Sequence, residues 1–127
     1  MQGDSLQVLV VDDHQDTLDG TMLVLRLDGH RARGASGGMR ALEELRTFEP
    51  DVMLIDCKLP DMTGYELARR VRSRPTVRRP YLAMVSGYCG AEHAAKSAEA
   101  GFDEHVVKPA DPTILQAILG RVRAGCY

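Results

Sequence analysis

The chain has 127 residues, of which 44% are hydrophobic and 27% are charged, and its formal net charge at pH 7 is −2. Its length is typical of a single domain, and its composition is that of a globular protein rather than a disordered one. The longest apolar runs lie at residues 8–11, 52–55 and 81–85, far short of the roughly 18 residues that a membrane-spanning helix needs. The weakly acidic charge excludes a general attraction to nucleic acid or to acidic membranes.

Two further features concern the environment of the protein. The N-terminus opens with Met1 and Gln2 and has no basic stretch leading into an apolar one, so we expect no secretory signal and a cytoplasmic location. The cysteines, Cys57, Cys89 and Cys126, are odd in number and show no C-x-x-C spacing. They fit neither a disulfide framework nor a zinc site, and we expect reduced thiols.

One local segment, residues 69–79, is rich in arginine. The chain has no tryptophan and few other aromatic residues on which bases could stack. Arginines late in a helix also complement its dipole, so a solvated surface is favoured over a nucleic-acid site.

Apolar runs alternate along the chain with stretches whose apolar residues recur every three or four positions. This alternation predicts an α/β fold with a parallel sheet covered by helices. The first strand is expected at 8–11 and is followed by a helix over 15–27 that ends at Asp28 and Gly29. A weaker strand at 30–34 leads through Gly37 and Gly38 into a second helix, in which Ala41, Leu45 and Phe48 share a stripe and which Pro50 breaks.

The second half of the chain repeats the alternation. A central strand is expected at 52–55, then a turn at 59–64 and a third helix whose inner face carries Leu67, Ala68 and Val71. A fourth strand at 81–85, an alanine-rich helix at 91–100 and a short strand at 105–107 follow. The last helix begins at Pro112. We expect one domain over residues 1–127, with no linker or repeat.

Polar side chains follow four of the five expected strands. Asp12 and Asp13 come after the first strand, Asp56 after the third, Ser86 after the fourth and Lys108 after the fifth. Ligands of open parallel sheets bind outside the carboxyl ends of the strands. If the first and third strands are neighbours, three carboxylates converge, and their repulsion calls for a hard divalent cation such as Mg²⁺. Lys108 would add a second positive charge and Ser86 a hydroxyl donor.

Each of these residues also has a structural interpretation. Asp12 or Asp13 alone could cap the N-terminus of the first helix. Asp56 and Ser86 could be turn residues, and Lys108 a surface lysine. Their coincidence at four strand ends favours one shared site.

Four segments in this order resemble the receiver domain of two-component response regulators: VLVVDD at 8–13, DCKLPDMTG at 56–64, SG at 86–87 and VVKP at 106–109. The match covers essentially the whole chain. GYELA at 64–68 and GFDEH at 101–105 are most similar to receivers attached to hybrid sensor kinases. The resemblance implies a flavodoxin-like doubly wound sheet with strand order 2-1-3-4-5.

The resemblance also implies roles for individual residues. Asp56 would accept a phosphoryl group from a histidine kinase or a histidine phosphotransfer protein. Asp12, Asp13, Asp56 and the backbone carbonyl of Cys57 would bind Mg²⁺, or Mn²⁺ in its place. Ser86 and Lys108 would contact the phosphoryl oxygens, and the bond between Lys108 and Pro109 would be cis.

Further positions would tune or transmit the signal. Lys58 and Tyr88 flank the path of the hydrolytic water in this family and would slow loss of the phosphoryl group. Many members carry Thr where this chain has Ser86, and the position of the usual aromatic switch holds His105. His105 is interpreted either as a switch or as an ordinary surface histidine near the last helix. We expect the Cys57 thiol to be buried and inert, whereas an exposed one would be oxidisable.

The leading functional hypothesis is a signalling switch that catalyses only its own phosphorylation and dephosphorylation and acts on a downstream protein through the last helices and the fifth strand. Direct binding of nucleic acid or membrane is not expected. A phosphatase using Asp56 as a covalent nucleophile is a second hypothesis. Phosphatase families with such a nucleophile carry a second acid two residues later, where this chain has Lys58. A flavin- or nucleotide-binding module is a third hypothesis, and a degenerate receiver that only binds partners is a fourth.

Overall fold

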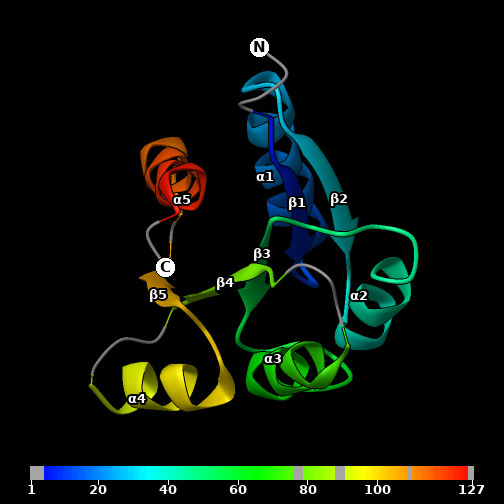
Figure 1. Cartoon of the computed structure of the whole chain (residues 1–127), viewed down its shortest axis with the longest axis vertical. Coiled ribbons are helices and arrows are strands. Elements are labelled where there is room, and N and C mark those ends of the chain that lie inside the picture. The colour runs from blue at the N-terminus through cyan, green and yellow to red at the C-terminus, as the bar shows by residue number, and fades with distance from the viewer. Residues whose placement is uncertain (1–4, 76–78, 88–90, 109, 126–127) are drawn as a thin grey trace.

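The computed structural model describes residues 5–75, 79–87, 91–108 and 110–125, and for 91–94 the backbone alone. A five-stranded parallel sheet forms its centre, in the order β2-β1-β3-β4-β5 (Figure 1). The strands are β1 (Gln7–Val11), β2 (Arg31–Ala35), β3 (Val52–Asp56), β4 (Tyr81–Ser86) and β5 (Glu104–Val107). The predicted class and strand order are confirmed, and every strand boundary lies within one residue of its expected place.

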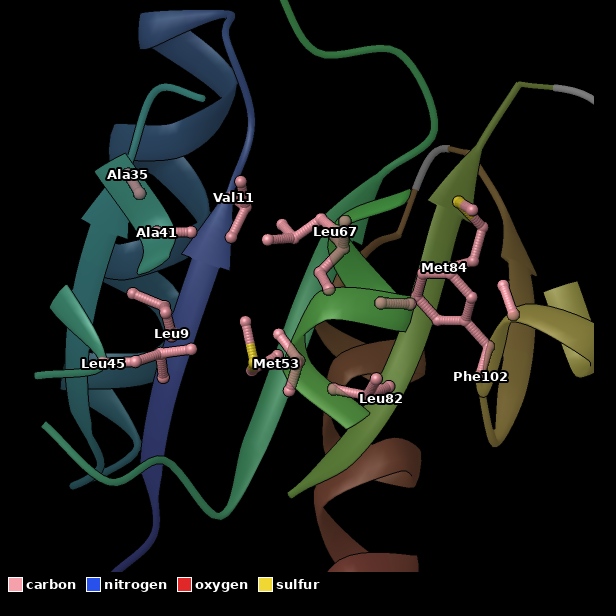
Figure 2. Packing of buried hydrophobic residues seen from close by; sticks show 14 of the residues in the cluster. Leu9, Val11, Ala35, Ala41, Leu45, Met53, Leu67, Leu82, Met84 and Phe102 are labelled. Carbon is pink, nitrogen blue, oxygen red and sulfur yellow. The ribbon is translucent and has the colours of Figure 1, made fainter. Parts of the chain in front are cut away.

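The helices cover both faces of the sheet. They are α1 (Gln15–Leu27), α2 (Gly38–Glu44), α3 (Gly64–Ser73), α4 (Ala91–Ala100) and α5 (Pro112–Ala124). Helices α1 and α5 lie on one face, and α2, α3 and α4 lie on the other (Figure 1). Because successive strand residues point to opposite faces, each strand feeds two cores. Leu9 and Met53 point toward α2 and α3, as Figure 2 shows, whereas Val8 and Leu54 belong to the core beneath α1 and α5.

The second helix is shorter than the sequence predicts, because it ends at Glu44 and not at Pro50. The backbone amides of Arg46 and Thr47 donate to the carbonyl oxygens three residues earlier, which tightens the chain into a turn. Phe48 is therefore outside the helix, although it is buried in the same core as Ala41. Phe48 keeps the spacing of a helical apolar stripe with Ala41 and Leu45 because the turn folds back onto the same core.

On the opposite face, helix α1 and the start of α5 lie where the sequence predicts. The backbone at Gly29, the second residue after α1, has a φ of 89°, a conformation that glycine adopts without strain. Asp111 caps α5, since its carboxylate accepts a hydrogen bond of 3.0 Å from the backbone N–H of Ile114. Pro112 occupies the first turn, where the helix needs no backbone donor.

A carboxylate from the β3–α3 loop caps helix α2. Both oxygens of Asp61 accept backbone hydrogen bonds, from the N–H of Gly38 and from that of Met39, each 2.9 Å long. These hydrogen bonds hold the pKa of Asp61 below its usual range. The helix that follows β2 is thereby joined to the loop that follows the central strand.

Candidate functional site

The carboxyl ends of β1 and β3 bring two aspartates together. The strands pair in register with Val11 opposite Ile55, so Asp12, which follows β1, lies beside Asp56, the last residue of β3. Both are nearly closed off from solvent, with exposed fractions of 6% for Asp12 and 8% for Asp56. The predicted convergence of carboxylates at this edge is therefore found in the structure.

Asp13 and His14 complete this group. One ligand atom from each of Asp12, Asp13, His14 and Asp56 lies within 4.8 Å of those of the other three. The His14 Nδ1 is 3.4 Å from a carboxylate oxygen of Asp12 and 3.3 Å from one of Asp13. His14 was not among the predicted site residues; its place directly after the two aspartates is the signal that could have found it.

Neither aspartate caps helix α1, so the structural interpretation of this pair is wrong. The N-cap residue is His14, and it makes no side-chain capping hydrogen bond. Asp12 instead accepts a hydrogen bond of 2.9 Å from the backbone N–H of His14. This bond holds the Asp12 carboxylate near the end of β1, where it meets Lys108 and Asp56, rather than over the helix.

Lys108 connects the two buried carboxylates. Its Nζ lies 3.6 Å from Asp12 Oδ2 and 3.5 Å from Asp56 Oδ1. Its backbone N–H donates to the carbonyl oxygen of Ser86 over 2.7 Å, so the ends of β4 and β5 are joined. Ser86 is the last residue of β4 and only 2% exposed. The structure thus brings Ser86 and Lys108 to the same edge as the acids.

Burial governs the charge of Asp56. Loss of solvent around its carboxyl group raises the pKa of Asp56, Lys108 lowers it, and the negative charge of Asp12 raises it further. The net shift is upward, although Lys108 is close. The site therefore favours an additional cation, which would keep Asp56 ionised.

Cys57 directly follows Asp56, and its thiol is buried. The carbonyl oxygen accepts a 2.7 Å hydrogen bond from the backbone N–H of Gly64, which uses one of its two lone pairs. The thiol belongs to the core beneath α3. The expected burial of this side chain is confirmed.

The remaining predicted residues are Lys58, Tyr88, Pro109 and His105. Lys58 is exposed and forms an isolated antiparallel bridge with Thr63, while Tyr88 and Pro109 lie outside the described residues. His105 is half-buried, and its Nε2 is buried without a hydrogen-bond partner among the described residues. It alternates along β5 with Val106, which packs in the core with α5. His105 therefore lies on the face of the sheet that α4 covers, opposite the last helix, and its role as a switch stays a prediction.

Among the described residues, no helix is long and apolar enough to span a membrane.

Comparisons with known proteins agree on one family. The family model of the response regulator receiver domain matches residues 8–120. The transcriptional regulatory protein CseB of Streptomyces coelicolor is 36% identical over 121 residues, which cover 95% of this chain and 49% of CseB. The virulence sensor protein BvgS of Bordetella pertussis is 37% identical over 112 residues, which cover 83% of this chain and 9% of BvgS. The chain thus spans about half of CseB and a small part of BvgS.

Solved structures show the same fold. The chemotaxis response regulator CheY4 of Vibrio cholerae superposes with a TM-score of 0.86 at 27% identity, covering 93% of this chain and 98% of CheY4. A response regulator from Chloroflexus aurantiacus has a TM-score of 0.86 at 29% identity and covers 94% of this chain and 98% of its own. With the family match and the site at the carboxyl edge of the sheet, these similarities show that the chain belongs to the response regulator receiver family, the phosphoacceptor domains of two-component signalling.

Proposed function

We propose that residues 1–127 form one receiver domain in which Asp56 accepts a phosphoryl group, with Mg²⁺, from a phosphohistidine of a histidine kinase or histidine phosphotransfer protein. Receiver domains are phosphorylated by histidine kinases and bind Mg²⁺ in an acidic pocket. The observation that carries the proposal for this chain is the convergence of Asp12, Asp13 and Asp56, with the Lys108 ammonium 3.5 Å from Asp56.

The donor set fits a hard cation. Asp12, Asp13 and Asp56 offer carboxylate oxygens. The Cys57 carbonyl, which accepts one hydrogen bond from Gly64, has a second lone pair that could bind the same ion. The His14 imidazole is a softer ligand and is not needed in the set. Mg²⁺, or Mn²⁺, supplies two positive charges that offset the acids and the incoming phosphoryl oxygens.

The transfer step follows from the position of Asp56. A carboxylate oxygen of Asp56 attacks phosphorus, the bond from phosphorus to the donor imidazole breaks, and its electron pair stays on the imidazole nitrogen. The attacking carboxyl group of Asp56 must be ionised. Burial raises the pKa of Asp56, and the positive charge of Lys108 helps to keep it ionised because it lowers this pKa. The ammonium of Lys108 and the hydroxyl of Ser86 would then contact the phosphoryl oxygens. Chemistry is thus confined to the protein's own aspartate.

The signal would leave through the ends of β4 and β5. A phosphoryl group adds between about 1.5 and 2 negative charges and attracts the Lys108 ammonium and the Ser86 hydroxyl. Because the Lys108 amide is bonded to the Ser86 carbonyl, the two strand ends shift together. The face formed by α4, β5 and α5 then changes its affinity for a downstream protein.

Lys58 and Tyr88 would set the lifetime of the phosphorylated state by shielding it from water. Lys58 is two residues after Asp56 and is exposed, as a shielding residue must be. Decay of radiolabelled protein should quicken in Lys58→Ala and in Tyr88→Ala, and it should be unchanged in Thr113→Ala on the exposed first turn of α5. Unchanged or slower decay in both variants contradicts the shielding role.

The acceptor assignment is tested by incubating wild type, Asp56→Asn and Asp16→Asn with acetyl phosphate and Mg²⁺. Asp16 is a matched control, because it is an exposed acid on α1 outside the cluster. Mass spectrometry should find an acyl phosphate in wild type and Asp16→Asn but not in Asp56→Asn. An aspartyl phosphate mapped to another residue, or sustained hydrolysis of an added phosphate ester, contradicts the proposal.

A further inference from the structure

A cavity of about 230 Å³ lies between α1 and α5, on the inner side of the acid cluster. Aliphatic side chains from four elements line one part of it: Val10 of β1, Leu54 of β3, Val85 of β4 and Leu115 of α5. Helix α1 contributes Thr17 and Thr21 to the wall. Asp12, Asp56 and Lys108 also line it, so it adjoins the proposed phosphorylation site.

The volume and walls suit a small apolar body. An apolar cavity of about 150 Å³ holds one benzene molecule, so a cavity of about 230 Å³ accommodates one aromatic ring with a short arm. The aliphatic walls offer water few hydrogen bonds, and an apolar ring would gain free energy by leaving water for them.

The charged side chains beside the cavity decide whether the polar group of such a ligand is a cation or an anion. The cluster holds three carboxylates, those of Asp12, Asp13 and Asp56. The ammonium of Lys108 lies 3.5 Å from Asp56 and 3.6 Å from Asp12. Negative charge is therefore in excess, which disfavours an anion. A primary ammonium has three donors and would make charge-assisted hydrogen bonds to Asp12 and Asp56.

We infer that this cavity binds a small primary amine with one aromatic ring. Its ammonium would contact the carboxylates of Asp12 and Asp56 beside the Lys108 ammonium that lies between them, and its ring would lie among Val10, Leu54, Val85 and Leu115. Such an amine uses two of the proposed Mg²⁺ ligands, so amine and metal compete, and the bound amine opposes phosphorylation. The inference rests on the acid cluster and the cavity, and it does not require that Asp56 be the phosphoacceptor.

The test uses benzylamine as the probe and wild-type protein without metal. Methyl NMR signals of Val10, Leu54, Val85 and Leu115 should shift saturably as benzylamine is added at pH 7. Benzyl alcohol has nearly the same shape without the charge and should bind about tenfold more weakly. Methylamine has the charge without the ring and should leave the wall methyl groups unshifted. Added Mg²⁺ should raise the apparent dissociation constant of benzylamine.

A variant that fills the cavity separates this site from adventitious surface binding. Thr21 is half-buried on α1 and lines the cavity, so Thr21→Leu should abolish the methyl shifts. Thr113→Leu adds the same side chain outside the cavity and should bind benzylamine like wild type. A Mg²⁺ titration of each variant by amide NMR reports whether the acid cluster is intact.

Several results would overturn the inference: wild-type wall methyl groups that stay unshifted at saturating benzylamine, equal binding of benzyl alcohol, or undiminished binding by Thr21→Leu. The titrations of the wild-type protein test the amine site without any variant. A misfolded Thr21→Leu variant would therefore not prevent a decision. Normal Mg²⁺ binding and phosphorylation without any amine effect would reject the amine site and leave the proposed function standing.

Discussion

The first residue of α3 lies directly against the backbone of the proposed phosphoacceptor. A Cβ built on Gly64 would be 2.5 Å from the carbonyl oxygen of Asp56, closer than such atoms approach in proteins. The Gly64 N–H also donates to the Cys57 carbonyl oxygen over 2.7 Å. The start of α3 can therefore lie this close to the end of β3 only because residue 64 has no side chain.

Gly64→Ala should consequently destabilise the protein by roughly 1–3 kcal/mol, because the end of β3 or the start of α3 must move. The same shift displaces Asp56 and should slow its phosphorylation by acetyl phosphate. Urea unfolding measures the stability change. Gly20→Ala is the control, since no atom lies within 4 Å of a Cβ at this exposed position in α1, and alanine should stabilise the helix by up to about 1 kcal/mol. Equal stability of Gly64→Ala and wild type contradicts the argument.

The clustered acids predict a response to metal. Without a cation, the carboxylates of Asp12, Asp13 and Asp56 repel one another. Asp13→Asn should therefore be more stable than wild type in the presence of a chelator, by roughly 0.5 kcal/mol because Asp13 is partly exposed to solvent. Mg²⁺ should raise the melting temperature of wild type more than that of Asp13→Asn. Thermal melts decide this, and indifference of both proteins to Mg²⁺ would show that the acids share no site.

His30 predicts a loss of stability in mild acid. It is 7% exposed, and its Nδ1 accepts a 3.0 Å hydrogen bond from the backbone N–H of Leu6, which only a neutral imidazole can do. Burial lowers the pKa of His30 below 6.5; the charge of Arg123 lowers it further and that of Asp28 opposes this.

The unfolded chain consequently binds a proton at a higher pH than the folded one. The stability that neutral His30 contributes is complete above pH 6.5 and is lost as the pH falls through the folded pKa. Urea unfolding between pH 5 and 8 should show this slope, and His30→Gln should reduce it. An identical slope in the variant would assign the pH dependence to other groups.

We expect a substitution of His105 to change the response of α4 and α5 to phosphorylation but not the phosphorylation itself. His105→Ala should leave the phosphorylation rate of Asp56 nearly unchanged but reduce the phosphorylation-dependent amide NMR shifts in α4 and α5. Shifts of wild-type size would show that the signal leaves by another route. His105→Phe adds a stability test. It removes Nε2, which has no hydrogen-bond partner in the part of the chain that the structure describes, and should stabilise the protein by about 1 kcal/mol.

The strands could be predicted within one residue because each apolar run is bounded by polar or turn residues. The grouping of Asp12, Asp56, Ser86 and Lys108 could be predicted as well, since parallel strands end at a common edge. Both conclusions depend on local pattern and topology alone.

What the sequence could not predict depends on how separate segments pack. The apolar spacing of Phe48 suits a helix, but the chain has already turned at Glu44, and the spacing is kept because the turn packs on the same core. Asp12 has the residue type of a helix cap, but its carboxylate is held by the His14 amide and lies beside Lys108. The cavity depends on the separation of α1 and α5, to which single residues such as Thr21 contribute little signal.

Because Asp61 caps α2, hydrogen exchange at two backbone amides of this helix reports on the loop between β3 and α3. The amide hydrogens of Gly38 and Met39 can exchange with solvent only when the Asp61 carboxylate releases them. Asp61 lies five residues after Asp56 on the same loop, so any event that loosens or tightens this loop changes the exchange rate of protons more than twenty residues earlier in the chain. If phosphorylation of Asp56 moves this loop, amide exchange at the first turn of α2 should therefore change with it.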